Sequence, residues 1–123
     1  MKNKKAKLRS KADKLFYEVC LKRNPYCLLC GKKANQVHHF KPKSLYGHLR
    51  YEYLNAISLC FSCHFKLTHQ DKSLSAKIAW KKGNDWYKKI EALAKNRPTS
   101  YQTTKWYEDN IKKLENILKY NYD

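Results

Sequence analysis

The sequence predicts a mostly helical α+β fold, in which a small centre of two strands and a short helix is stapled by a metal and flanked by helices at both ends. Three observations support this prediction. Apolar residues recur with helical spacing in the first and last parts of the chain. Two short apolar runs in the middle are typical of strands, and two Cys-x-x-Cys pairs enclose them.

The first predicted element is a helix over residues 6–22. Its apolar residues follow helical spacing: Leu8, Ala12, Leu15, Phe16 and Val19. Asn24-Pro25 ends this helix, because the residue before a proline is pushed out of the α region. Cys20, which lies outside both cysteine pairs, falls on the helix, and we expect it to be a small buried side chain.

The middle of the chain is predicted to contain strands at 36–40 and 56–59, followed by a helix over 61–69. A further helix is expected at 74–82, with Gly83-Asn84 as its stop and Asp85 as the cap of the next. That next helix carries an apolar face and ends before a proline: its residues are Trp86, Ile90 and Leu93, and its end is Asn96-Arg97-Pro98.

Thr104 opens the last predicted helix, whose apolar stripe consists of Tyr107, Ile111, Leu114 and Leu118. We interpret this stripe as core, with a dimer seam as the alternative. The length of 123 residues suits one domain. We divide it into a basic helix at 1–23, a metal-bound core at 24–70 and a helical extension at 71–123.

The charge is strongly positive, with 27 Lys and Arg against 10 Asp and Glu, a formal net charge of +17. The excess occurs in all three parts of the chain, which favours a polyanionic partner. No apolar run is long enough to span a bilayer. The Lys-rich start lacks the apolar region of a secretory signal, so we expect a cytoplasmic protein that is not secreted.

The two cysteine pairs, Cys27–Cys30 and Cys60–Cys63, have the spacing of a tetrahedral zinc site with four cysteine ligands. Gly31 after the first pair suits the tight turn of a knuckle. Two disulfides or plain buried thiols are the alternatives, which a reducing compartment disfavours. Four thiolate ligands leave no position for water, so this zinc would be structural.

Three polar residues that could bind a metal or take part in catalysis lie between the pairs: His38, His39 and Asn55. His64 follows the second pair directly. Adjacent residues of a strand point to opposite faces, so one histidine could bind a metal while the other faces a substrate. The Asn55 carbonyl could hold a histidine Nδ1–H and leave Nε2 free to take a proton. His64 could reach the same metal as His38.

The order Cys-x-x-Cys, His-His, Asn and Cys-x-x-Cys-His resembles the HNH endonucleases with a ββα-metal site, over roughly residues 26–69. A weaker resemblance, to the NinG-like recombination proteins of lambdoid phages, rests on His39-Phe40, Leu49-Arg50-Tyr51 and Leu54-Asn55. It adds a nuclease acting on branched DNA in phage recombination as an alternative function, and a phage-infected or bacterial cell as the setting.

The resemblance implies a role for each site residue. His39 would be the general base, Asn55 would orient its ring, and His38 and His64 would bind one catalytic Mg²⁺ or Mn²⁺, with other divalent cations left open. Cleavage would leave 5′-phosphate and 3′-hydroxyl ends. His69 is a tentative third ligand, because it lies five residues after His64 and this spacing turns it away from the shared helix face.

Arg50 is the basic residue that we expect at the phosphate near the cut, with Lys41, Lys43 and Lys66 as further contacts. His48 is interpreted as a surface residue or a phosphate contact. We find no base-reading motif and therefore expect contacts mainly to the DNA backbone. The predicted function is a DNA endonuclease, acting as a monomer or homodimer, and a non-catalytic zinc-dependent nucleic-acid-binding module is the alternative of another class.

Overall fold

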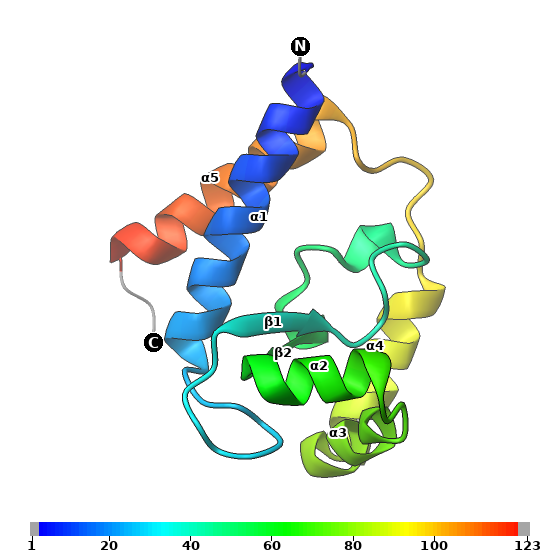
Figure 1. Ribbon diagram of the computed structural model, residues 1–123. Helices are drawn as coiled ribbons and strands as arrows, with labels where there is room; N and C mark the ends of the chain where they lie inside the picture. The colour runs from blue at the N-terminus through cyan, green and yellow to red at the C-terminus, as the bar shows by residue number, and fades with distance from the viewer. Residues whose placement is uncertain (1–2, 121–123) are drawn as a thin grey trace.

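The computed structural model describes residues 3–120 and has a mostly helical α+β architecture around a small sheet (Figure 1). In chain order its helices and strands are α1 (Lys4–Arg23), β1 (Gln36–His39), β2 (Ala56–Leu59), α2 (Phe61–His69), α3 (Leu74–Lys82), α4 (Asn84–Lys95) and α5 (Thr104–Tyr120). Two short 3-10 turns, η1 (Gly47–Leu49) and η2 (Tyr53–Asn55), lie between the strands. The predicted fold class is confirmed.

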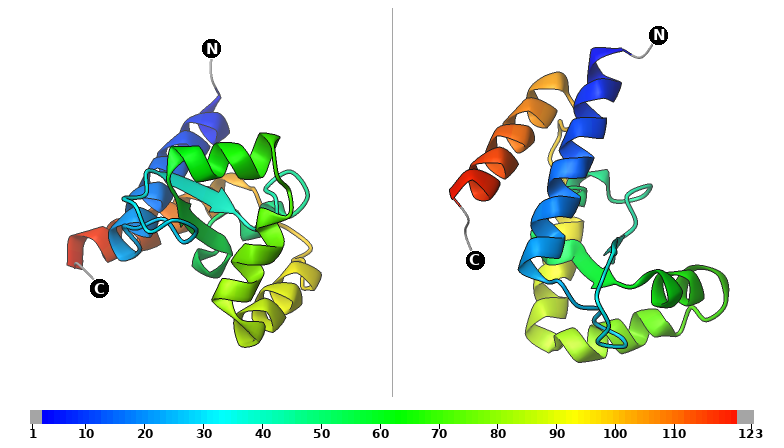
Figure 2. Two further views of the ribbon diagram at one scale, coloured as in Figure 1. Left: turned by 60° about the horizontal axis from the view of Figure 1, so that its bottom comes forward. Right: turned by 60° about the vertical axis from the view of Figure 1, so that its left-hand side comes forward.

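The two strands form one antiparallel sheet in which His38 is paired with Ile57 and His39 with Ala56. Figure 1 shows α2 across the front of this sheet, and Figure 2 shows α1 and α5 lying side by side beyond its other face. The sheet therefore separates two groups of helices, with α2, α3 and α4 on one side and α1 and α5 on the other.

Each side of the sheet has its own apolar core. On the α2–α4 side the buried residues include Ile57, Leu59, Leu67, Ile78, Trp86 and Ile90. On the α1–α5 side they include Ala12, Phe16, Val19, Cys20, Tyr51, Tyr107, Ile111 and Leu114. The stripe of the last helix is thus core packed against α1, as predicted, and not an exposed dimer seam. Cys20 is buried, also as predicted, and its burial raises the pKa of the thiol to about 12.

The helix boundaries follow the local signals closely, with one correction. The first helix starts earlier than predicted because the Asn3 side chain caps it, accepting a hydrogen bond from the Ala6 N–H. Asp85 was predicted to cap α4, but the cap is Gly83, and Asp85 lies in the first turn. Gly83 has φ +97°, a conformation that lets one helix end and the next begin without a loop.

Candidate functional site

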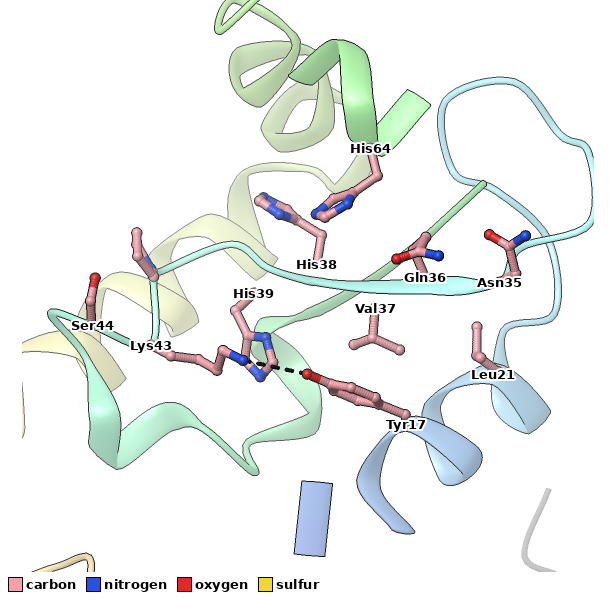
Figure 3. Close-up of a pocket in the computed structure, with 11 residues that line it drawn as sticks. Tyr17, Leu21, Asn35, Gln36, Val37, His38, His39, Lys43, Ser44 and His64 are labelled. Atoms are coloured by element: carbon pink, nitrogen blue, oxygen red, sulfur yellow. Dashed lines mark hydrogen bonds between the residues drawn. The ribbon is translucent and has the colours of Figure 1, made fainter. Parts of the chain in front are cut away.

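The candidate site is built on β1, which places its two histidines on opposite faces of the sheet as predicted (Figure 3). His38 points to the α2 side, where its partner across the ladder is the core residue Ile57. His39 points to the α1 side, opposite Ala56. Because no strand covers the outer edge of β1 among the described residues, both histidines border the same surface groove.

His38 and His64 form a pair on the α2 side. Their ring centroids lie 5.5 Å apart, and the rings are inclined by 60°. His64 is in the first turn of α2, which is capped by Cys60 through the Cys63 N–H. Burial lowers the pKa of His38 to about 4 and also lowers the pKa of His64. Both imidazoles are therefore neutral near pH 7, the form that binds a metal ion.

His39 is 8% exposed and is held from two sides. Its Nε2 lies 2.9 Å from the backbone carbonyl oxygen of Arg50, and its ring lies 5.9 Å from that of Phe16 and 6.4 Å from that of Tyr17. A carbonyl oxygen can only accept, so Nε2 carries the hydrogen and Nδ1 is the unprotonated nitrogen. The predicted assignment, with Nε2 free, is therefore reversed. Burial lowers the pKa of His39 to about 4.

Arg50 was predicted to contact the phosphate near the cut, but its side chain does not point into the groove. Its guanidinium is bound by a carboxylate from α1. Its Nε and one terminal nitrogen donate to the two oxygens of Asp13 at 2.8 and 2.7 Å. The Tyr51 hydroxyl donates to the same carboxylate at 2.8 Å. Burial alone would raise the pKa of Asp13, but the hydrogen bonds and charge of Arg50, with the Tyr51 bond, bring it below its usual value. This two-pronged ion pair joins α1 to the loop that contains Arg50, and the Arg50 carbonyl orients His39.

Asn55 does not contact the His39 ring, in contrast to the prediction. Its side chain is fully buried and is satisfied by the backbone of Lys41, with Oδ1 accepting from the N–H at 2.7 Å and Nδ2 donating to the carbonyl at 3.0 Å. The Asn55 carbonyl also accepts from the Phe40 N–H at 2.9 Å. Asn55 therefore clamps the chain just after β1, and its effect on His39 is through the backbone.

The four paired cysteines gather at the end of the sheet next to α2. The Sγ atoms of Cys27, Cys30, Cys60 and Cys63 all lie within 4.8 Å of one another. Four sulfurs at the zinc–sulfur distance of about 2.3 Å would be about 3.8 Å apart, and those of Cys30 and Cys60 are 3.6 Å apart. Gly31 has φ +81°, as the knuckle requires. The cluster fits a structural metal such as zinc.

The comparison with known families agrees with this geometry. Residues 25–70 match the family model of the HNH endonucleases. The resemblance predicted from the motif is confirmed for that segment, which we call the HNH segment. No curated protein and no solved structure matches the chain. The HNH segment contains β1, β2, α2, the cysteine cluster and the three histidines discussed above, whereas α1 and α3–α5 lie outside it.

The groove next to the HNH segment has a volume of about 500 Å³. It is lined by residues of β1, α1, α2 and the loop after β1, among them His38, His39, His64, Tyr17 and Lys43. Figure 3 shows His38 and His64 on one side of the strand and His39 with Tyr17 and Lys43 on the other. The Lys43 ammonium donates to the Tyr17 hydroxyl at 3.4 Å, so its charge is fixed beside His39.

The other predicted residues lie elsewhere. Lys41 forms an ion pair with Glu91 of α4, and Lys66 is exposed on α2. His69 is exposed with its ring 4.7 Å from that of Phe65, and it forms no metal-binding group with His38 and His64 among residues 3–120. His48 is not a surface residue: it is half-buried and its Nε2 donates to the Leu93 carbonyl at 3.0 Å.

Sequence reasoning missed Asp13 and Tyr17, which reach the site from α1. Neither residue belongs to a motif. The partners of Asp13, Arg50 and Tyr51, are more than thirty residues away in the chain. One signal was available: Asp13 is one of two acidic residues in the first 23 and lies four residues before Tyr17, on the same helix face. Such a lone carboxylate beside an apolar stripe indicates a specific cationic partner.

None of the described helices combines the length and the apolar character needed to cross a membrane.

Proposed function

We propose that the chain is a metal-dependent endonuclease that hydrolyses DNA phosphodiester bonds, with His39 as the general base. One observation carries the proposal: a histidine pair and a separately oriented third histidine border a single groove from opposite faces of one strand. The match of the surrounding segment to the HNH endonucleases supports a nuclease-type function for this groove.

His39 supplies the proton acceptor. With Nε2–H donated to the Arg50 carbonyl, Nδ1 is the nitrogen that takes a proton from the attacking water. The water oxygen forms the new bond to phosphorus while the bond from phosphorus to the 3′ oxygen breaks. That oxygen takes a proton from solvent, and the products carry a 5′-phosphate and a 3′-hydroxyl. The Arg50 carbonyl also stabilises the imidazolium that forms, because Nε2–H remains its donor.

His38 and His64 are the residues that would hold the catalytic cation. Two neutral imidazoles at the groove surface would hold one divalent ion and leave its other positions to water and phosphate oxygens. The proposal of Mg²⁺ or Mn²⁺ follows from the resemblance to the HNH endonucleases, because imidazole nitrogens by themselves favour ions such as Zn²⁺ and Ni²⁺. Such an ion, when bound, stabilises the negative charge that develops on the phosphate and the leaving oxygen.

The substrate is proposed to be DNA held mainly through its backbone. Lys43 is the basic side chain placed beside His39, and its contact with Tyr17 orients it toward the groove. Lys66 adds an exposed charge on α2, the helix that carries His64. The net charge of +17 supplies sequence-independent attraction, so we expect affinity to fall steeply with salt.

The test is cleavage of supercoiled plasmid by zinc-retaining protein, with and without added Mg²⁺ or Mn²⁺. His39→Ala is expected to abolish nicking while zinc content, near-ultraviolet circular dichroism and DNA binding stay unchanged. His69→Ala is the matched control, because this histidine is exposed and does not line the groove, and it should cut like the unaltered protein. Cation-dependent cutting by His39→Ala would refute the role of this base.

The alternative, a non-catalytic zinc-dependent nucleic-acid-binding module, makes a different prediction. The plasmid would be retarded at low salt, no cation would produce cleavage, and His39→Ala would change nothing. Comparing branched with linear DNA in the same assay separates a nuclease for recombination intermediates from a general one.

A further inference from the structure

A second surface feature lies outside the groove, between α3, α4 and the residue that follows β1. It is a hollow of about 410 Å³ with aromatic walls formed by Phe40, Trp80 and Tyr87. Trp80 is 81% exposed and Tyr87 is 40% exposed. Tryptophan is buried on average in folded proteins, so an indole exposed to this extent marks a surface that contacts something else.

The floor of the hollow is rigid. The Phe40 ring packs edge-on against Trp86 at 4.9 Å and against Tyr87 at 6.3 Å. Trp86 is itself buried, and its indole N–H donates to the Leu54 carbonyl at 2.7 Å. On the α3 side, the small residues Ala76 and Ala79 line the hollow beside Trp80 and leave room for a flat ring. The Phe40 and Tyr87 rings are therefore held in place before any ligand binds.

The hollow lies on the same side of the sheet as the His38–His64 pair. Phe40 is two residues after His38, so its side chain points to the same face, about 7 Å further along the strand. Its packing confirms this, since Phe40 contacts the core that contains Ile57, the ladder partner of His38. The hollow and the histidine pair therefore face the same side of the sheet, which allows one strand of nucleic acid to contact both.

The surrounding charge indicates what kind of molecule binds there. Lys77 and Lys81 flank Trp80 on α3, and Lys88 follows Tyr87 on α4, all of them exposed. Exposed lysines around an aromatic surface suit a ligand with flat rings and a negative backbone. A second copy of this chain would bring another net charge of +17 against these lysines, which disfavours self-association through this face.

We infer that the hollow binds an unpaired base of single-stranded DNA, stacked on Trp80 and Tyr87, next to the phosphodiester bond at the histidine pair. In a duplex both faces of each base are covered by its neighbours, so only an unpaired base can stack on Trp80. The hollow thus favours DNA with a single-stranded segment over intact duplex. This inference rests on the proposed function for the position of the bond, and on the hollow alone for the stacking.

The test compares the affinity of two labelled probes by fluorescence anisotropy, without added divalent cation so that no cleavage occurs. The probes are an oligothymidylate of about 12 nucleotides, within the range of known single-strand sites, and a blunt-ended duplex of the same length, which has no unpaired base. Trp80→Ala is expected to weaken binding of the oligothymidylate on the order of 10-fold and of the duplex less than about 2-fold. Trp80→Phe should retain most of the affinity.

Tyr26→Ala is the matched control, because Tyr26 is 65% exposed and does not line the hollow. It should bind both probes like the unaltered protein. Equal loss for both probes in Trp80→Ala, or no loss for either, would overturn the inference. So would sedimentation showing that the unaltered protein is a dimer and Trp80→Ala a monomer, because the face would then be covered by a second copy.

The outcome is independent of the nuclease test. Binding is measured without cation and without cleavage, so an inactive protein can still show Trp80-dependent stacking. Conversely, plasmid cutting that depends on His39 but not on Trp80, together with unchanged oligothymidylate binding, would retain the nuclease and refute the stacking site.

Discussion

Replacing Asp13 by Asn tests whether α1 holds His39, the proposed general base, in place. The substitution keeps the shape of the side chain and removes its charge. In the structure the carboxylate accepts two hydrogen bonds from the Arg50 guanidinium and one from the Tyr51 hydroxyl. An amide has one oxygen instead of two, so the two-pronged contact with Arg50 is lost.

The loss of free energy of unfolding follows from the burial of the Asp13–Arg50 pair. The Asp13 and Arg50 side chains are 23% and 17% exposed, between a surface ion pair and a fully buried one. Surface pairs contribute below about 1 kcal/mol and broken buried pairs cost about 3–5 kcal/mol, so we expect a loss of roughly 2 kcal/mol. For a chain of this length that corresponds to a fall in melting temperature of roughly 6–10 °C.

The effect on activity is expected to go through the backbone of Arg50. Its carbonyl orients His39 through Nε2, and once the side chain is released the loop is free to shift. Misplacing a reacting group by about 1 Å can cost on the order of 100-fold in rate. We therefore expect Asp13→Asn to lower kcat by roughly 10- to 100-fold with little change in KM, when assayed well below its melting temperature.

Glu115→Gln is the matched control for this experiment. It makes the same chemical change in an exposed α1–α5 ion pair, Lys11–Glu115, whose side chains are 58% and 50% exposed. It should change stability by less than about 1 kcal/mol and leave kcat unchanged. If Asp13→Asn is destabilised but cuts DNA at the normal rate, the path from Asp13 through Arg50 to His39 is refuted.

Acid provides an independent check on the same carboxylate. The pKa of Asp13 is lower in the folded chain than its usual 3.8, so its stabilisation is fully present above that value. As the pH falls through the folded pKa the carboxylate is protonated and the contribution is lost. The difference in free energy of unfolding between the unaltered protein and Asp13→Asn should hold from neutral pH to about 4 and shrink below it. A difference that grows in acid would contradict this assignment.

Two further predictions concern the elements that frame the groove. Chelation of zinc should unfold the β1–β2–α2 region, because Cys27 is part of the same packed core as Ile57 and Leu67. Hydrogen exchange would show the loss there, and equal protection with and without zinc would contradict the prediction. Asn55→Ala leaves the Lys41 backbone N–H and carbonyl unpaired and should cost about 2–4 kcal/mol by denaturant titration. A loss below about 0.5 kcal/mol would show that water satisfies both groups.

The sequence predicted those features that depend on neighbours close in the chain. Apolar periodicity placed α1, α4 and α5, the spacing of the cysteines predicted their cluster, and strand alternation predicted that His38 and His39 face opposite ways. Errors arose where the partner comes from a distant element. Arginine is a residue type that often contacts phosphate, but in this fold the Arg50 guanidinium donates to the Asp13 carboxylate of α1.

Asn55 shows a second kind of error, in which a side chain forms its hydrogen bonds with a backbone group instead of with the predicted side chain. The motif indicated that Asn55 belongs to the site, and the residue is indeed fully buried beside it. Its amide is complementary to the N–H and carbonyl of Lys41, just after the end of β1, and this double hydrogen bond directs the side chain to that backbone and not to the His39 ring. Which polar partner a buried amide chooses depends on the register of the sheet, and no spacing in the sequence encodes that choice.

The helices outside the HNH segment stabilise one side of the sheet and orient His39, and the same contacts do both. A segment as short as residues 25–70 buries little apolar surface for a domain that is stable by itself, and a metal bound by the cysteine cluster would stabilise its α2 end. The other end is held by α1, which in turn is packed along α5 through Phe16, Tyr107 and Ile111. Asp13 lies on that helix and fixes the loop of Arg50, so the contacts that stabilise this side of the sheet also orient His39. For this reason we expect the orientation of His39 to depend on packing between α1 and α5 even though α5 does not line the groove.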